Sequence, residues 1–218
     1  MSLQGEDPIA DLLDQAKPGD PAGWSAPSPR RELRVRTVDF SQPTKFTKEE
    51  QRHLRRAHET FCRTASTRLS ADFRTPIDLE LIAGTQYTWS SALSEVQNET
   101  VCAVVRATPT GDRFAMMIDL TLLLSLIERL FGGDAGKVPP DRPLSDIDMR
   151  IGGRVMEMLL EQLSVVWRDL LGLGLEFVEF EPEPATAGIV PLSEPVLSLT
   201  TEARIARSSF TLTTLIPY

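Results

Sequence analysis

The stretch from Leu130 to Pro140, LFGGDAGKVPP, places glycines beside a lysine, a combination that can cradle a phosphate. Such a loop needs a glycine five residues before its Gly-Lys pair and a serine or threonine after the lysine, because backbone amides surround the phosphates and the hydroxyl binds Mg²⁺. Here the pair is Gly136-Lys137, the first position holds Phe131, and Val138 follows the lysine. Two prolines come next, so no helix begins there to donate its amides. Nucleotide binding is therefore not predicted.

Histidines and cysteines suggest no metal site or nucleophile. His53 and His58 are five positions apart on one predicted helix, which is about 140° around its axis, so they do not share a metal as a four-residue spacing allows. We expect surface or partly packed histidines. Cys62 and Cys102 have no paired spacing, and we expect small core residues of a reduced protein.

Carboxylates gather in the stretch EFVEFEPEP, where they imitate a catalytic pair. They alternate with Phe177, Val178 and Phe180, so we expect them on the solvent side of a strand and its exit. The chain contains no Gly-x-Ser-x-Gly motif. The sequence predicts no catalytic residue, cofactor or small-molecule substrate.

Composition indicates a folded, acidic protein. Of the 218 residues, 41% are hydrophobic and 25% charged, and 23 Lys and Arg stand against 31 Asp and Glu for a net charge of −8. This balance argues against nucleic-acid binding, and the basic runs RRELRVR and RHLRR are expected to be a solvated arm and face. No apolar run approaches the roughly 20 residues that span a bilayer, and the first residues are acidic, unlike a signal peptide. We expect a cytoplasmic protein.

The folded domain that positions these residues is expected to begin near Thr37. Thr47 followed by Glu50 predicts a capping box, and the helix behind it carries an apolar stripe. The stripe consists of Leu54, Ala57, Phe61, Ala65 and Leu69. We expect the helix to end before Pro76, and the stretch TPIDLELIA predicts a strand.

The following segments predict a short helix, YTWSSALSEV, two strands, TVCAVVRA and RFAMMIDL, and a helix from Thr121 to Phe131. Ser145 then caps a second long helix, which Gly172 ends. The apolar face of this helix is expected to consist of Ile147, Ile151, Val155, Leu159, Val166 and Leu170. We expect the two long helices to pack together.

The order of elements then repeats. A long helix leads into the strand GLEFVEF, and PVLSLTTEARI and SFTLTTLIPY pair as a second hairpin. The pattern predicts two similar units around a pseudo-twofold axis, with a mostly antiparallel sheet because the connecting turns are short. The second unit stops where the first continues into a helix, so we expect a chain cut from a longer protein.

The first 36 residues are predicted to be a disordered tail that contains one short partner-binding helix, and the alternative is a disordered end in which the leucines occur by chance. Their stretch GEDPIADLLDQAKPGD places Ile9, Leu12 and Leu13 on one side of a short helix, followed by a segment rich in Pro, Gly, Ser and Ala. A helix this short is marginal alone, so we expect a partner to order it.

From VDFSQPTKF to the final IPY the chain resembles the middle domain of the flagellar motor switch protein FliM. The resemblance is carried by HETF, LSADFRTPIDLEL, LIERLFGG, LSDIDMRI, SEPVLSLTTEARI and IPY, in that family's order. It implies a three-layer α/β/α domain over residues 37–218, related to the CheC and CheX phosphatases and placed side by side in the rotor ring at the cytoplasmic face of the inner membrane. The family continues past IPY into a FliN-like domain, which this sequence lacks.

The resemblance also implies two partner-binding segments. A Gly-Gly-x-Gly motif of the family contacts the rotor protein FliG, and Gly132 and Gly133 match its first two positions, whereas the fourth is Ala135. The implied FliG site therefore comprises Leu130, Phe131, Gly132, Gly133, Asp134, Ala135 and Gly136, with a plain helix-ending turn as the alternative. The implied site for phosphorylated CheY is Ile9, Leu12 and Leu13.

Two alternatives stay open. A CheC-type phosphatase would need a Glu and an Asn three residues later on each long helix, but the corresponding positions hold Arg56 and Glu59, and Met149 and Gly152. The resemblance therefore implies a binding protein. The other alternative is an unrelated α/β interaction domain.

Overall fold

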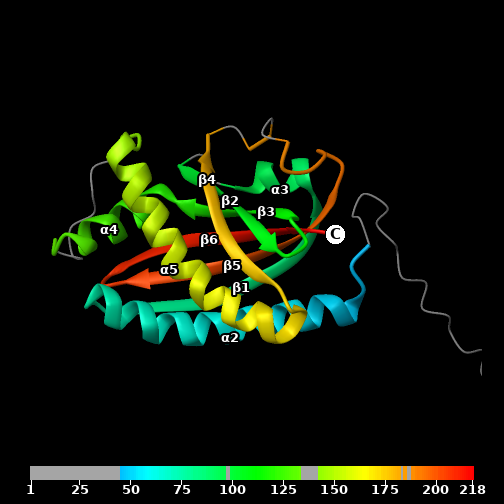
Figure 1. Ribbon diagram of the computed structural model, residues 1–218, viewed down its shortest axis with the longest axis horizontal. Coiled ribbons are helices and arrows are strands. Elements are labelled where there is room, and N and C mark those ends of the chain that lie inside the picture. The colour runs from blue at the N-terminus through cyan, green and yellow to red at the C-terminus, as the bar shows by residue number, and fades with distance from the viewer. Residues whose placement is uncertain (1–44, 97–98, 134–141, 183, 186–187) are drawn as a thin grey trace, which may run out of the picture. The chain divides into compact units, whose positions relative to one another are not determined.

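The computed structural model describes residues 45–96, 99–133, 142–182, 184–185 and 188–218. This part of the chain contains both helices and strands (Figure 1). They are α2 (Lys48–Phe73), β1 (Ile77–Thr88), α3 (Trp89–Glu95), β2 (Thr100–Thr108), β3 (Arg113–Asp119), α4 (Leu120–Leu130), α5 (Asp146–Leu171), β4 (Gly174–Glu181), β5 (Pro195–Ile205) and β6 (Ser208–Pro217).

The strands of the described residues form one sheet in the order β1-β5-β6-β3-β2-β4, with antiparallel neighbours throughout. Exchanging β1 with β4, β2 with β5 and β3 with β6 gives the same order read from the opposite edge of the sheet. The predicted pseudo-twofold repeat is therefore confirmed, and its axis passes between β3 and β6. The first strand of each unit pairs with the hairpin of the other unit, so the two halves interlock.

The two units also share a hydrogen-bonding pattern, in which a serine of each long helix binds the backbone of the strand that follows. In the first unit the Ser70 hydroxyl accepts from the Ile77 amide at 2.9 Å and donates to its carbonyl at 3.1 Å. In the second unit Ser164 makes the same pair of hydrogen bonds with Leu175, at 2.9 and 3.3 Å. Each serine thus fixes the start of the next strand against its helix.

Both faces of the sheet are covered, because successive residues of a strand point to opposite sides. On β2, Ala103 and Val105 belong to the larger core, which α2, α4 and α5 cover, whereas Cys102 and Val104 belong to a smaller core around Trp89 of α3. This is the predicted α/β/α arrangement, with one thin outer layer (Figure 1).

The predicted helix caps are confirmed. Thr47 and Glu50 form a capping box at the start of α2, and Ser145 forms another with Asp148 at the start of α5. Gly172 ends α5 in the left-handed conformation, with φ of 71°. The predicted packing of α2 against α5 is also observed.

The apolar face predicted for α5 is wrong at both ends, where Ile147 and Leu170 are 68% and 42% exposed. Val155 and Leu159 are buried as predicted. The buried side also includes Gly152 and Gly153, which let the helix approach Phe180 and Phe177, whose ring atoms would lie 3.1 Å from an added Cβ.

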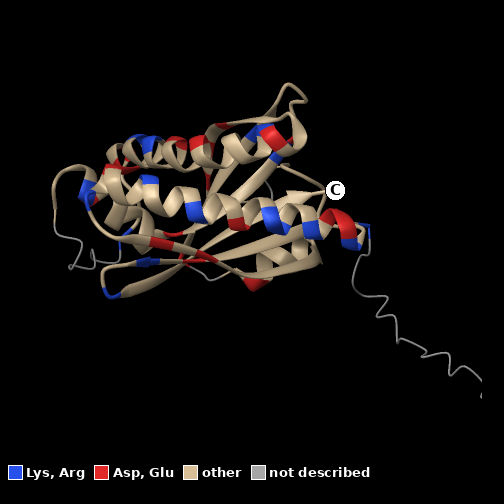
Figure 2. Ribbon diagram, turned by 90° about the horizontal axis from the view of Figure 1, so that it is seen from below, with Lys and Arg blue, Asp and Glu red and all other residues tan. Residues whose placement is uncertain are grey.

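The basic run RHLRR lies on α2, where Arg52, Arg55 and Arg56 are exposed, as expected of a solvated face (Figure 2). Within the described residues, no helix is long and apolar enough to cross a membrane. The predicted division into a tail, residues 1–36, and a domain, residues 37–218, falls at residues that are not described and stays a prediction.

Candidate partner-binding site

The glycine pair of LFGGDAGK forms the turn that ends α4. The Gly133 amide donates to the Glu128 carbonyl at 3.0 Å, and the Gly132 amide donates to the Arg129 carbonyl at 2.9 Å. Gly132 has φ of 81°, so these bonds make a Schellman motif. The helix-ending turn that the sequence offered as an alternative is therefore present.

Both glycines are required by this turn, for different reasons. Nothing lies within 4 Å of a Cβ added at Gly132, but its positive φ disfavours other residues. A Cβ added at Gly133 would lie 2.4 Å from Cγ of Glu128 and 3.0 Å from its carbonyl oxygen. Any side chain there displaces the end of α4.

An apolar surface precedes the turn. Phe131 is 72% exposed and Leu130 is 39% exposed, although α4 is otherwise largely buried. An exposed phenylalanine beside a side-chain-free turn can insert into a partner. The other predicted FliG residues, Asp134, Ala135 and Gly136, lie outside the described residues. The predicted CheY residues, Ile9, Leu12 and Leu13, also lie outside them.

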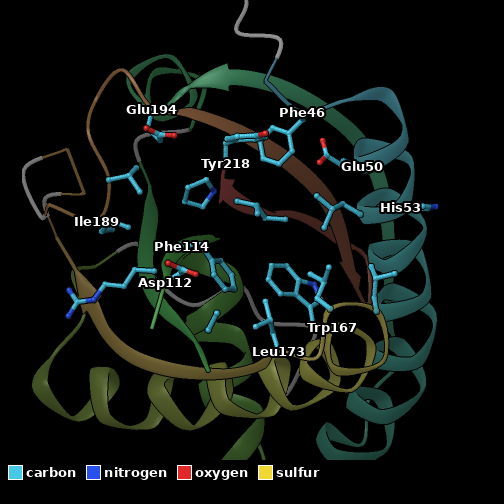
Figure 3. Close-up of a pocket in the computed structure, with 18 of the residues that line it drawn as sticks. Phe46, Glu50, His53, Asp112, Phe114, Trp167, Leu173, Ile189, Glu194 and Tyr218 are labelled. Atoms are coloured by element: carbon cyan, nitrogen blue, oxygen red, sulfur yellow. The ribbon is translucent and has the colours of Figure 1, made fainter. Parts of the chain in front are cut away.

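A cavity of about 650 Å³ opens at the end of the domain where α2 begins and α5 ends. Figure 3 shows Phe114 and Trp167 on one side of this space and Phe46 and Tyr218 on the other. The first two rings are stacked with centroids 5.1 Å apart, and the second two meet edge to face at 5.3 Å. An apolar group fits such walls. The sequence did not predict this cavity, because five separate segments build it.

The two histidines do not share a site. His53 is exposed on α2, and Figure 3 shows its ring pointing away from the cavity. His58 is only 1% exposed, so the expectation of a surface or partly packed histidine is wrong for it. Its Nε2 lies 2.9 Å from Oγ1 of Thr201 on β5, and burial lowers its pKa from 6.5 to about 4. It is a neutral core residue.

The cysteines are core residues, as expected. Cys62 and Cys102 are 2% and 1% exposed, and burial raises the pKa of their thiols to about 11 and about 12. Both therefore stay protonated at neutral pH and are poor nucleophiles. Across the described ranges, no three His, Cys, Asp or Glu side chains are grouped so as to hold a metal ion.

The first three carboxylates of EFVEFEPEP, Glu176, Glu179 and Glu181, lie on β4. Glu176 and Glu179 are exposed, as expected for the solvent side of the strand. The nearest cation to Glu176 is Arg106 on the neighbouring strand, with Nε 3.9 Å from the carboxylate. This is a surface ion pair between strands, worth little to stability.

The four positions aligned with phosphatase residues do not assemble a site. Arg56 and Glu59 are exposed on α2, and Met149 is 40% exposed at the start of α5. Gly152 is buried, and an added Cβ would lie 3.1 Å from the Phe180 ring. A side chain added at Gly152 would therefore press against that ring.

Comparison with known proteins gives consistent matches. Relatives named "Flagellar motor switch protein FliM" include one from Treponema pallidum (strain Nichols), 29% identical over 213 residues, which are 98% of this chain and 62% of the relative. Another, from Thermotoga maritima, is 31% identical over 184 residues, 83% of this chain and 54% of the relative. The chain thus spans only part of the length of these relatives.

Solved structures share the fold. A chain of the FliG-FliM complex from H. pylori superposes with a TM-score of 0.73 at 22% identity, over 79% of this chain and 94% of that chain. Thermotoga maritima FliY superposes with a TM-score of 0.67 at 16% identity, over 79% of this chain and 92% of that one. Residues 47–218 match the family model "Flagellar motor switch protein FliM". This match covers most of the sequence, so the chain belongs to the FliM family.

Proposed function

We propose that this chain is a non-enzymatic rotor and switch component of the bacterial flagellar motor, and that it binds FliG through the segment from Leu130 to Gly136. Family membership and the similarity to a chain of the FliG-FliM complex from H. pylori support this assignment. The observation that carries the site is Phe131, which is 72% exposed at the end of an otherwise buried helix.

The geometry of the turn explains why this end of α4 suits a partner. Gly132 has open space where a side chain would stand, so a partner backbone can approach closely. Phe131 then supplies the apolar anchor, and burying a phenylalanine side chain contributes about 2 kcal/mol. The glycines shape the site and Phe131 makes the contact.

Replacing Phe131 tests the site better than replacing the glycines, since the glycines are needed for the turn itself. We expect Phe131→Ala to weaken FliG binding by about 2 kcal/mol, or roughly 30-fold, in a calorimetric titration. The matched control is Ile82→Ala, because Ile82 is 55% exposed on strand β1. Equal affinity of the Phe131→Ala protein and the parent, with unchanged thermal unfolding of both, would exclude the site.

We further propose that the tail binds phosphorylated CheY through Ile9, Leu12 and Leu13, and that this sets the direction of rotation. These residues share one side of a short helix in the sequence. Joint replacement Leu12→Ala and Leu13→Ala should weaken binding by about 2 kcal/mol or more. Its FliG affinity should be unchanged. A titration giving the double variant full affinity for phosphorylated CheY would make the tail a bystander.

Family membership also supports three further proposals, which concern self-association, FliN binding and the place of the chain in the cell. We propose that copies of the chain lie side by side in the rotor ring, contact FliN, and act at the cytoplasmic face of the inner membrane. The alternative of a CheC-type phosphatase is disfavoured by the Phe180 ring that covers Gly152.

A further inference from the structure

Arg129 lies in the last turn of α4 and joins three backbone carbonyls from two distant segments. Its Nε and Nη2 donate to the Phe73 carbonyl at 3.2 and 2.9 Å, and Nη2 also donates to the Arg74 carbonyl at 2.8 Å. Its Nη1 donates to the carbonyl of Gly133. One guanidinium therefore links the end of α2 to the glycine turn.

The α2 side of this link is firmly fixed. The last carbonyls of a helix have no partner within the helix, and a cation at that end is favourable. The Ser70 and Ala71 carbonyls accept from the amides that follow α2, whereas Arg129 serves those of Phe73 and Arg74. Phe73 is 2% exposed in the main core, so the guanidinium is anchored to a rigid part of the domain.

The turn side needs such an anchor. No atom lies within 4 Å of a Cβ added at Gly132, and the Phe131 side chain is largely exposed to solvent. Packing of these two residues therefore does not hold the turn in place. Its hydrogen bonds are the two Schellman bonds, the bond from the Phe131 amide to the Glu128 carbonyl, and the bond from the Arg129 side chain to Gly133. Because the same guanidinium also binds the Phe73 and Arg74 carbonyls, this side-chain bond connects the turn to the end of α2.

We propose that Arg129 is a positioning residue for FliG binding: it holds the glycine turn against the end of α2 so that Phe131 is presented in one orientation. This inference rests on the proposed FliG site. A lysine cannot replace the arginine, because a single ammonium lacks the planar fork that reaches carbonyls on two sides.

The test compares FliG affinity in the full chain carrying Arg129→Lys or Arg129→Gln. If the turn is held in its binding conformation only a tenth of the time, the apparent Kd rises about tenfold, and this is the loss we expect for both variants. The Lys variant keeps a positive charge at the end of α2. If the Gln variant shows no cooperative unfolding, and so is not folded, the affinity of the Lys variant alone decides the test.

Two controls separate positioning from charge and from stability. Arg74→Asn removes a neighbouring positive charge and keeps a residue that tolerates the φ of 51° found there. Thr47→Ala removes the capping box at the other end of α2 and so destabilises the same helix. We expect both controls to bind FliG within twofold of the parent. Equal weakening by either control would overturn the proposal, since charge or stability would then explain the loss.

Amide hydrogen exchange distinguishes positioning from stabilisation, because a loss of overall stability would not speed exchange at the turn alone. In Arg129→Lys the Gly133 amide should exchange faster while the amides of the buried residues Leu123 and Met156 keep their protection. Parental affinity of both Arg129 variants, alongside weakened binding by Phe131→Ala, would refute the positioning role and leave the FliG site standing. Full binding by Phe131→Ala would instead remove the site on which the inference rests.

Discussion

His58 should make the stability of this domain fall between neutral and mildly acidic pH. Its ring is buried between α2 and β5, and burial lowers its pKa from 6.5 to about 4. Between these values the unfolded chain binds a proton that the folded chain does not. The contribution of His58 is therefore complete above pH 6.5 and is lost as pH falls toward 4.

The two pKa values set the size of the effect. Linkage with 6.5 in the unfolded state and about 4 in the folded state gives a loss of about 2 kcal/mol from pH 7.5 to pH 5. Replacing the ring with leucine removes this dependence and also the hydrogen bond to Thr201, which contributes about 1 kcal/mol. The His58→Leu protein should then be less stable than the parent at pH 7.5 and more stable at pH 5.

Urea unfolding at several pH values, followed by circular dichroism, measures this crossing. Both proteins contain the same carboxylates, so the pH dependence that these groups cause cancels when the free energy of unfolding of the variant is subtracted from that of the parent. His53→Gln is the matched control, because His53 lies on the same helix but is exposed. Parallel stability curves for the parent and His58→Leu from pH 7.5 to 5 would refute the reasoning.

Three further substitutions test the packing. Gly152→Asn, which restores one phosphatase residue, should cost about 1–3 kcal/mol in urea unfolding because its Cβ would lie 3.1 Å from the Phe180 ring. Trp89→Phe should lower the melting temperature, because the smaller ring leaves a cavity at a fully buried position, while no hydrogen bond of the Trp89 Nε1 is lost within the described part of the chain. Ser164→Ala should cost about 1–3 kcal/mol by chemical denaturation, because the amide and carbonyl of Leu175 lose their partner.

Local features of the fold followed from the sequence. A capping box depends on residues three positions apart, so Thr47 with Glu50 was enough to place the start of α2. The two hairpins of the sheet followed from the sequence for a related reason, since each short turn fixes its two strands as antiparallel neighbours. The exchange of first strands between the halves involves distant partners, and no local pattern predicted it.

Features that depend on close approach did not follow from the sequence. Helical periodicity predicted an apolar face for α5 that included Ile147, which is exposed, and it did not predict the close contact of Gly152 and Gly153 with the rings of Phe180 and Phe177. The full burial of His58 was not predicted, because a polar residue type is usually found at least partly exposed. Arg129 was missed too, although a basic residue in the last turn of a helix is a signal for carbonyl contacts.

The interlocking of the two halves bears on how the chain is made. Strand β1 leaves the ribosome early, but its only neighbour in the described sheet, β5, is synthesised after both long helices. The hairpin of β2 and β3 likewise waits for β6 to cover its open edge. Throughout most of translation the nascent domain therefore exposes unpaired strand edges, which other chains can join. The described sheet is complete only once β6 has been synthesised, so this topology prolongs the time during which the growing polypeptide is open to such pairing.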